Sequence, residues 1–227
     1  MDPHKLIQTL IHTEATRTYR RDEPQYRPVV TLSRDLGSGG EEIAQRLSAA
    51  LHVPLYDRQI LDAVAERAKV DPGLVARLDE KGADLRDAWI YALLSGQSAH
   101  LTNYRHHLVS VILCLAQQGG VIMGRGAHVI LGTREVFRLR IVGSEQKCAE
   151  RVAAREGSTL GAAREKVRQV NAERDEALFG LFKRRLSEAQ LFDLVLNTDK
   201  VTDWEAATGI VLAAMQKMGF RLKGPHG

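Results

Sequence analysis

The chain has 227 residues, a formal net charge of +4, a hydrophobic content of 44% and a charged content of 26%. These values are close to those of soluble globular proteins and exclude a disordered or collagen-like chain. Two cysteines without a CxxC spacing exclude a disulfide framework and a zinc site of that type. We therefore expect two buried thiols, a cytoplasmic setting and no membrane span, because the longest apolar stretch covers only residues 108–116.

Residues 1–26 precede the first expected strand. Leu6, Ile7, Leu10 and Ile11 lie at helical spacing and predict a short amphipathic helix, which ends before a polar run. We interpret the segment as an arm packed on the domain or on a second subunit of a homodimer. A partner-binding peptide is the alternative.

Five short apolar runs predict buried strands, and helical patterns separate them. The expected strands cover residues 29–33, 53–57, 121–124, 137–142 and 194–197. Residues 58–118 are almost entirely helical in pattern, and further helices are expected over 144–155, over 160–186 and from Thr202 onward, where Thr202 and Glu205 form a capping box. This alternation predicts an α/β domain over residues 27–220, with a parallel sheet covered by helices on both faces, followed by a tail over 221–227.

A glycine turn, residues 34–40, connects the first expected strand to the first expected helix and contains Gly37-Ser38-Gly39-Gly40. Glycines allow a backbone to direct successive N–H groups at one anion, and the following helix adds the positive end of its dipole. The turn is therefore either a phosphate-binding loop or a tight left-handed turn without a ligand.

The glycine turn departs from the GxxxxGK[ST] pattern of phosphate-binding loops. When Gly39 takes the second glycine position, Arg34 stands at the first glycine and Gly40 at the lysine. Glu41 then stands where a magnesium-binding hydroxyl is usual. Arg34 is the nearest residue that could supply the missing positive charge, and a solvated loop arginine is the alternative.

Four segments taken together resemble the cytidylate kinase-like family of P-loop nucleoside monophosphate kinases. They are Thr31–Gly40, Val53–Arg58, Gly124–Ala127 and Phe192–Thr198. The resemblance extends over residues 28–218. It implies a five-stranded parallel sheet, a helical monophosphate-binding insert over 58–118 and a mobile lid over 156–188. The implied reaction transfers the γ-phosphoryl group of ATP to a nucleoside monophosphate such as CMP or dCMP, with Mg²⁺.

The resemblance and the chemistry of phosphoryl transfer together select candidate site residues. Phosphoryl transfer requires positioned positive charge, and open α/β sheets bind ligands at the carboxyl ends of their strands. The expected ATP-binding residues are Gly37, Ser38, Gly39, Gly40 and Glu41. The expected catalytic arginines are Arg34, Arg168 and Arg174, the last two in a lid pattern with Asn171 between them. The expected acceptor-binding residues are Asp57, Arg58 and Arg125, with Asp57 also holding Mg²⁺ through water.

Each of these assignments has a structural alternative. Arg125 could instead pin a loop through carbonyl groups, and Asp57 could cap the next helix. Ten basic and six acidic residues between positions 146 and 185 could form a solvated face rather than a lid. The isolated His128 is expected at the surface or supporting a neighbour.

Three functional hypotheses follow from these observations, and the first of them requires nucleotide substrates as binding partners. They are an ATP-dependent nucleoside monophosphate kinase, a catalytically inactive nucleotide-binding regulatory domain, and a basic protein that binds nucleic acid or another partner. The last is disfavoured because no DNA-reading helix or aromatic stacking motif is recognisable and aromatic residues make up only 5% of the chain.

Overall fold

The computed structural model describes residues 27–57, 61–62, 99–201 and 203–222. The predicted N-terminal arm, Arg58, most of the predicted insert and the end of the tail lie outside the described residues. Among the described helices, none is long and apolar enough to span a membrane.

A five-stranded sheet forms the centre of the molecule. Its strands are β1 (Val29–Arg34), β2 (Leu55–Tyr56), β3 (Gly120–Met123), β4 (Phe137–Val142) and β5 (Leu194–Asn197). They lie in the order β2-β3-β1-β4-β5, and every neighbouring pair is parallel. The central strand β1 therefore ends between the ends of β3 and β4. The five strands and the fold class predicted from the sequence are confirmed.

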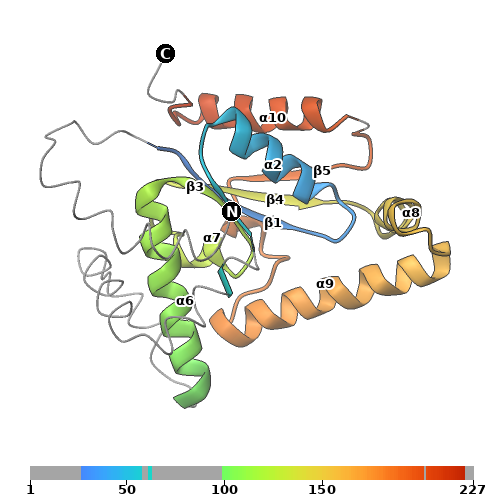
Figure 1. Ribbon diagram of the computed structural model, residues 1–227, viewed down its shortest axis with the longest axis horizontal. Helices are drawn as coiled ribbons and strands as arrows, with labels where there is room; N and C mark the ends of the chain where they lie inside the picture. The colour runs from blue at the N-terminus through green and yellow to red at the C-terminus, as the bar shows by residue number, and fades with distance from the viewer. Residues whose placement is uncertain (1–26, 58–60, 63–98, 202, 223–227) are drawn as a thin grey trace, which may run out of the picture.

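Helices cover both faces of the sheet (Figure 1). On one face, α2 (Gly40–Ala50) and α10 (Trp204–Lys217) pack against Val30 and Leu32 of β1 and the alternate residues of β4. On the other face lie α6 (Ala99–Gln118), α7 (Ala127–Ile130) and the C-terminal half of α9 (Leu160–Phe182). Because side chains alternate along a strand, these two cores receive alternate residues of β1.

A third core joins the glycine turn to a helical hairpin. The hairpin consists of α8 (Glu145–Glu156) and α9. Gly157 caps the C-terminus of α8, and Thr159 caps the N-terminus of α9. Leu36 of the turn packs there with Cys148, whose burial bears out the expected buried thiol. The long helix α9 is thus packed at both ends, against this core and against the α6 core.

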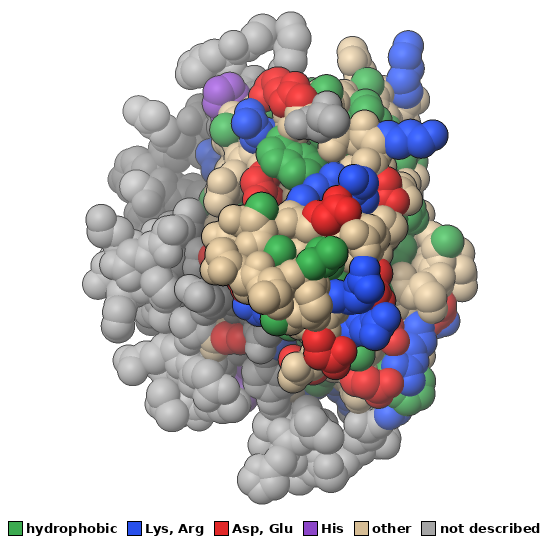
Figure 2. All heavy atoms as spheres, turned by 90° about the vertical axis from the view of Figure 1, so that its right-hand side faces the viewer, with side chains coloured by type: hydrophobic (Ala, Val, Ile, Leu, Met, Phe, Trp, Pro, Cys, Tyr) green, Lys and Arg blue, Asp and Glu red, His purple; other side chains and the backbone are tan. Residues whose placement is uncertain are grey.

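The surface around this hairpin carries paired charges. Figure 2 shows basic and acidic side chains interspersed on this face. Lys147 pairs with Glu150 at 2.9 Å, and Lys166 pairs with Glu156 at 2.6 Å. Much of the basic excess that the sequence places in this region is therefore spread over local ion pairs, each of which contributes little to stability when exposed.

The closing helix differs in detail from the sequence prediction. Asp203 caps α10 by accepting hydrogen bonds from the N–H groups of Glu205 and Ala206. A 3₁₀ turn, η1 (Ala189–Leu191), precedes β5. Met218 follows the last helical residue and is 51% exposed.

The core beneath α2 generates a stability prediction. Leu47 is fully buried against the sheet. Leu47→Ala should lower the free energy of unfolding by about 2–5 kcal/mol, because it removes buried methyl groups and leaves a cavity. Urea unfolding followed by circular dichroism measures this, with the exposed Gln45→Ala in the same helix as the control. Equal losses in the two variants would contradict the packing of α2.

Candidate active site

The carbonyl groups of the glycine turn are held from one side. Thr198, which is fully buried, donates from Oγ1 to the carbonyl oxygen of Ser38 at 2.8 Å. Arg151 donates from Nη1 to the carbonyl oxygen of Gly37 at 3.3 Å. Gly37 and Gly39 have φ values of 81° and 80°, in the left-handed region that glycine favours.

Asp35, Leu36 and Ser38 of the turn donate their amides to other groups, but the remaining amides that face the start of α2 have no acceptor among the described residues. Side chains cap the N-termini of α8, α9 and α10, whereas no side chain caps α2. Within the part of the chain that is described, no hydrogen bond uses the amides of Gly37, Gly39, Gly40 and Glu41. A group of unused amides at the positive end of a helix dipole is the usual arrangement for binding phosphate.

Arg34 fills the space that a side chain at position 40 would need. A β-carbon on Gly40 would lie 2.4 Å from Cβ of Arg34, which is far closer than atoms approach. The GxxxxGK[ST] pattern has a glycine at position 34 and a lysine at position 40. In this chain the cation, Arg34, stands at the first position and the glycine, Gly40, at the second. A β-carbon on Gly39 would likewise lie 2.3 Å from the indole ring of Trp204.

Arg34 and Arg174 come together beside Glu41, on the strand side of the turn. Nε of Arg34 donates to Oε1 of Glu41 at 2.9 Å, and the Arg34 side chain is only 12% exposed. Nη1 of Arg174 donates to the carbonyl oxygen of Arg34 at 2.9 Å, and its Nη2 lies 3.9 Å from the same Glu41 oxygen. Two guanidinium groups thus share one carboxylate.

The two arginines influence each other electrostatically. Burial, and then the positive charge of Arg34, lower the pKa of Arg174 to about 10. Arg174 therefore remains charged at neutral pH. Nη1 of Arg34 lies 3.4 Å from the point where a β-carbon of Gly124 would stand, so the guanidinium reaches across to the end of β3.

The Gly124-Arg125-Gly126 segment after β3 has φ values of 84°, 52° and 70°. Arg125 is thus a non-glycine residue in the left-handed region, a strained conformation that is concentrated at functional sites. It donates from Nε to Oδ1 of Asp62 at 2.6 Å and pairs with the other carboxylate oxygen through Nη2. No side chain fits at Gly126, because a β-carbon there would lie 2.4 Å from the ring of Phe182.

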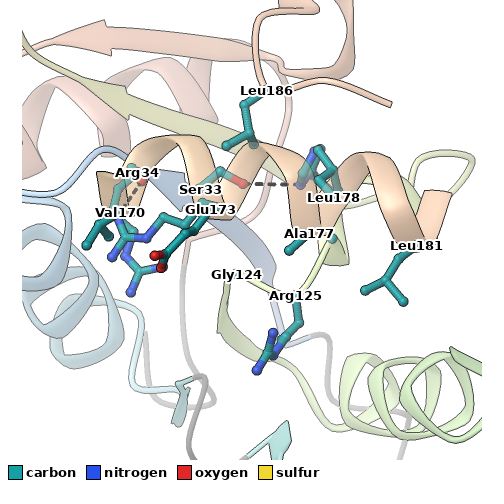
Figure 3. Close-up of a pocket in the computed structure, with 13 residues that line it drawn as sticks. Ser33, Arg34, Gly124, Arg125, Val170, Glu173, Ala177, Leu178, Leu181 and Leu186 are labelled. Carbon is teal, nitrogen blue, oxygen red and sulfur yellow. Dashed lines mark hydrogen bonds between the residues drawn. The ribbon is translucent and has the colours of Figure 1, made fainter. Parts of the chain in front are cut away.

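A cavity of about 180 Å³ lies between this segment and α9 (Figure 3). Its polar boundary consists of Ser33, Arg34, Arg125, His128, Glu173 and Arg174. Its apolar wall consists of Val170, Ala177, Leu178, Leu181 and Leu186. The cavity therefore has positive charge at the carboxyl ends of β1 and β3 and an apolar surface along α9. That combination suits a ligand with an anionic end and a flat or apolar body.

A buried histidine supports the floor of the cavity. The ring of His128 stacks on Phe192 at 4.7 Å, and its Nδ1 lies 3.1 Å from Oγ of Ser33. Burial, and then the charges of Arg140 and Arg138, lower the pKa of His128 to about 3. It is thus a buried neutral residue rather than a surface one, and its Nε2 has no hydrogen-bond partner among the described residues.

The structure separates the two predicted lid arginines. Arg168 is 58% exposed and pairs with Glu145 of α8 at 2.8 Å, away from the cavity. At about 100° per residue, positions 168 and 174 lie about 120° apart around the helix and therefore face different sides of it. Asn171 shares the face of Arg174 and accepts a hydrogen bond from the amide of Leu36 at 2.8 Å.

Asp57 does not line the cavity; its carbonyl oxygen accepts a hydrogen bond from the amide of Leu61 at 3.0 Å. Arg58 lies outside the described residues. The roles of Ser33 and Arg151 could not be predicted from the sequence, because nothing in the local pattern distinguishes them from ordinary strand and surface residues.

The sheet order, the glycine turn and the cluster of cations at the strand ends define a P-loop kinase-type α/β fold. The sequence matches the cytidylate kinase-like family over residues 29–200, and the chain belongs to that family. Membership supports a phosphotransferase that acts on nucleotides. No curated protein matches the chain in sequence.

Three solved structures are similar to the chain at low sequence identity, and the first of them shares its fold. An uncharacterized protein from Eubacterium ventriosum superposes with a TM-score of 0.67 at 21% identity, covering 85% of this chain and 99% of that one. A shikimate kinase from Bacteroides thetaiotaomicron has a TM-score of 0.46 at 13% identity, with 83% and 98% of the two chains covered. A gluconokinase from Sinorhizobium meliloti has a TM-score of 0.45 at 13% identity, with coverages of 86% and 94%.

The buried histidine predicts how stability depends on pH. The pKa of His128 is about 3 in the folded protein and 6.5 for an unperturbed histidine, so between these values the unfolded chain binds the extra proton. The His128 contribution should lower the free energy of unfolding by about 1.4 kcal/mol per pH unit as the pH falls below 6.5. His128→Gln should show a shallower decline between pH 6.5 and 4.5 in urea unfolding. Parallel pH profiles would contradict the assignment.

Proposed function

We propose that the protein transfers the γ-phosphoryl group of ATP to a nucleoside monophosphate, with CMP or dCMP as the first acceptors. The observation that carries the proposal is the convergence of Arg34 and Arg174 beside the unused amides of the glycine turn. Arg34 supplies, from the strand side of the turn, the charge that a lysine at position 40 would supply from the helix side.

In this mechanism the chain positions groups and stabilises charge, with no covalent step of its own. The amides of Gly37, Gly39 and Gly40 bind the ATP phosphates. Arg34 and Arg174 stabilise the negative charge that develops on the transferring phosphoryl group, an effect that is large in a site sheltered from water. Arg125 binds the acceptor phosphate, and the apolar wall of α9 receives the body of the acceptor.

A magnesium ion at this site would be carried mainly by the nucleotide. Among the described residues there is no group of three or more side chains that could hold a metal by themselves. Magnesium commonly uses one or two carboxylates together with substrate phosphates and water, and it neutralises charge on those phosphates. We propose Asp57, which follows β2 at the same edge of the sheet, as the residue that holds the ion through water.

The choice of CMP or dCMP rests on the family to which the chain belongs. The cavity is compatible with it, because Arg125 borders the polar side and the α9 wall can cover a flat base. A nucleotide-binding regulatory domain is the second candidate function, and the replacement of the usual lysine by Gly40 is the observation that favours it.

The first test compares arginines in a transfer assay. The protein with ATP, Mg²⁺ and CMP or dCMP should form the nucleoside diphosphate. Arg34→Ala and Arg174→Ala should each reduce kcat by about 10²–10³ with a smaller effect on ATP binding, because their charge acts mainly in the transition state. Arg164→Ala, on the same helix as Arg174 but beside Glu145 of α8 and away from the cavity, should leave kcat unchanged. ATP binding without any transfer would favour the regulatory domain instead.

A second test reverses the exchange between positions 34 and 40. Gly40→Lys alone should impair folding or activity, because its β-carbon overlaps Arg34. Arg34→Gly should lose turnover, and the double variant Arg34→Gly/Gly40→Lys should regain about tenfold or more of it by restoring one preorganised cation. Melting temperature and kcat measure the two effects. A double variant no more active than Arg34→Gly would show that the two positions do not substitute for each other.

A further inference from the structure

Glu41 is an acidic residue inside a site that has to bind acidic ligands. It is the second residue of α2, and its side chain is one-third exposed beside the half-buried Arg34. A carboxylate at a helix N-terminus interacts favourably with the dipole, but so does Glu42 in the same turn. The helix dipole therefore does not account for the particular contacts of Glu41.

The contacts of Glu41 fix one end of a guanidinium and leave the other end available. Its Oε1 accepts the hydrogen bond from Nε of Arg34, not from either Nη group. Nη1 of Arg34 points instead to the end of β3, 3.4 Å from where a β-carbon of Gly124 would stand. An arginine held at Nε keeps its terminal nitrogens in a fixed direction.

The same carboxylate oxygen also lies 3.9 Å from Nη2 of Arg174. Two guanidinium groups this close repel each other, and the charge of Arg34 contributes to the lowered pKa of Arg174. A negative oxygen between them reduces that repulsion and allows both to remain at the end of β1 before a ligand is bound.

We propose that Glu41 is a positioning residue for phosphoryl transfer: it holds Arg34 by Nε, beside Arg174, so that the Nη groups of Arg34 face the transferring phosphoryl group. This inference rests on the proposed function. Glu41 and Arg34 together then supply the positioned positive charge that the lysine supplies in the GxxxxGK[ST] pattern. Glu41 acts through Arg34, and its carboxylate is neither a metal ligand nor an anion that substrate must displace.

The experiment compares Glu41→Ala, Glu41→Gln and the neighbouring Glu42→Ala. The amide oxygen of Glu41→Gln can still accept from Nε of Arg34, so this variant should retain kcat within a few-fold. Glu41→Ala should lose kcat by about tenfold or more while the Kd for ATP changes much less. Among the described side chains, Glu42 has no contact with Arg34. Glu42→Ala should therefore keep the kcat and the ATP affinity of the unaltered protein.

A second measurement does not depend on catalysis. The Nε–H signal of Arg34 in nitrogen NMR, assigned by its loss in Arg34→Lys, should exchange slowly with water in the unaltered protein and in Glu41→Gln. It should exchange rapidly in Glu41→Ala. If the unaltered protein transfers no phosphoryl group yet shows this pattern, the proposed function fails and the positioning contact stands.

Three results would overturn the inference. If the Glu41 carboxylate bound magnesium, Glu41→Gln would lose magnesium-dependent ATP binding as fully as Glu41→Ala does. If the carboxylate occupied the phosphate site until ATP displaced it, both variants would bind ATP more tightly, with kcat unchanged. Normal kcat and slow Nε–H exchange in Glu41→Ala would show that Arg34 is positioned without Glu41, even where the kinase activity is present.

Discussion

The close approach between the end of β1 and the first turn of α2 is the constraint on which the site depends. Gly40 has no side chain, so Arg34 can pack directly over the start of the helix. This contact determines the side of the turn from which positive charge reaches the ligand. It also places Nε of Arg34 within hydrogen-bond distance of Glu41, one residue further along α2.

The turn itself is held by residues from distant parts of the chain. Thr198 after β5 and Arg151 of α8 bind its carbonyl groups, and Trp204 at the start of α10 covers Gly39. Arg151 also lies over the indole of Trp204 at 5.1 Å. These contacts leave little room for the turn to rearrange. A preorganised turn is useful for phosphate binding because the amides need no reordering when the ligand arrives.

Polar groups lie between part of the sheet and α9. Arg140 pairs with Asp35 at 2.5 Å, and Ser33 contacts His128. These groups lie on the face of the sheet opposite α2 and α10, because their positions alternate with the apolar ones. The cavity borders these groups, so polar groups form its floor while α9 supplies its apolar wall. Arg34 and Arg125, at the ends of β1 and β3, therefore lie close to the apolar wall along α9, which partly excludes water.

The sequence by itself determined the five strands, the glycine turn and the candidacy of Arg34, because these depend on local patterns and on neighbours in the chain. It also indicated Arg174, although it grouped it with Arg168, since a residue pattern does not show which side of a helix meets the domain. The tertiary structure decided that Arg174 faces the turn, that Glu41 joins the two arginines and that His128 is buried. Each of these depends on how helices from distant parts of the chain are rotated against the sheet, and that rotation is set by packing of the whole core.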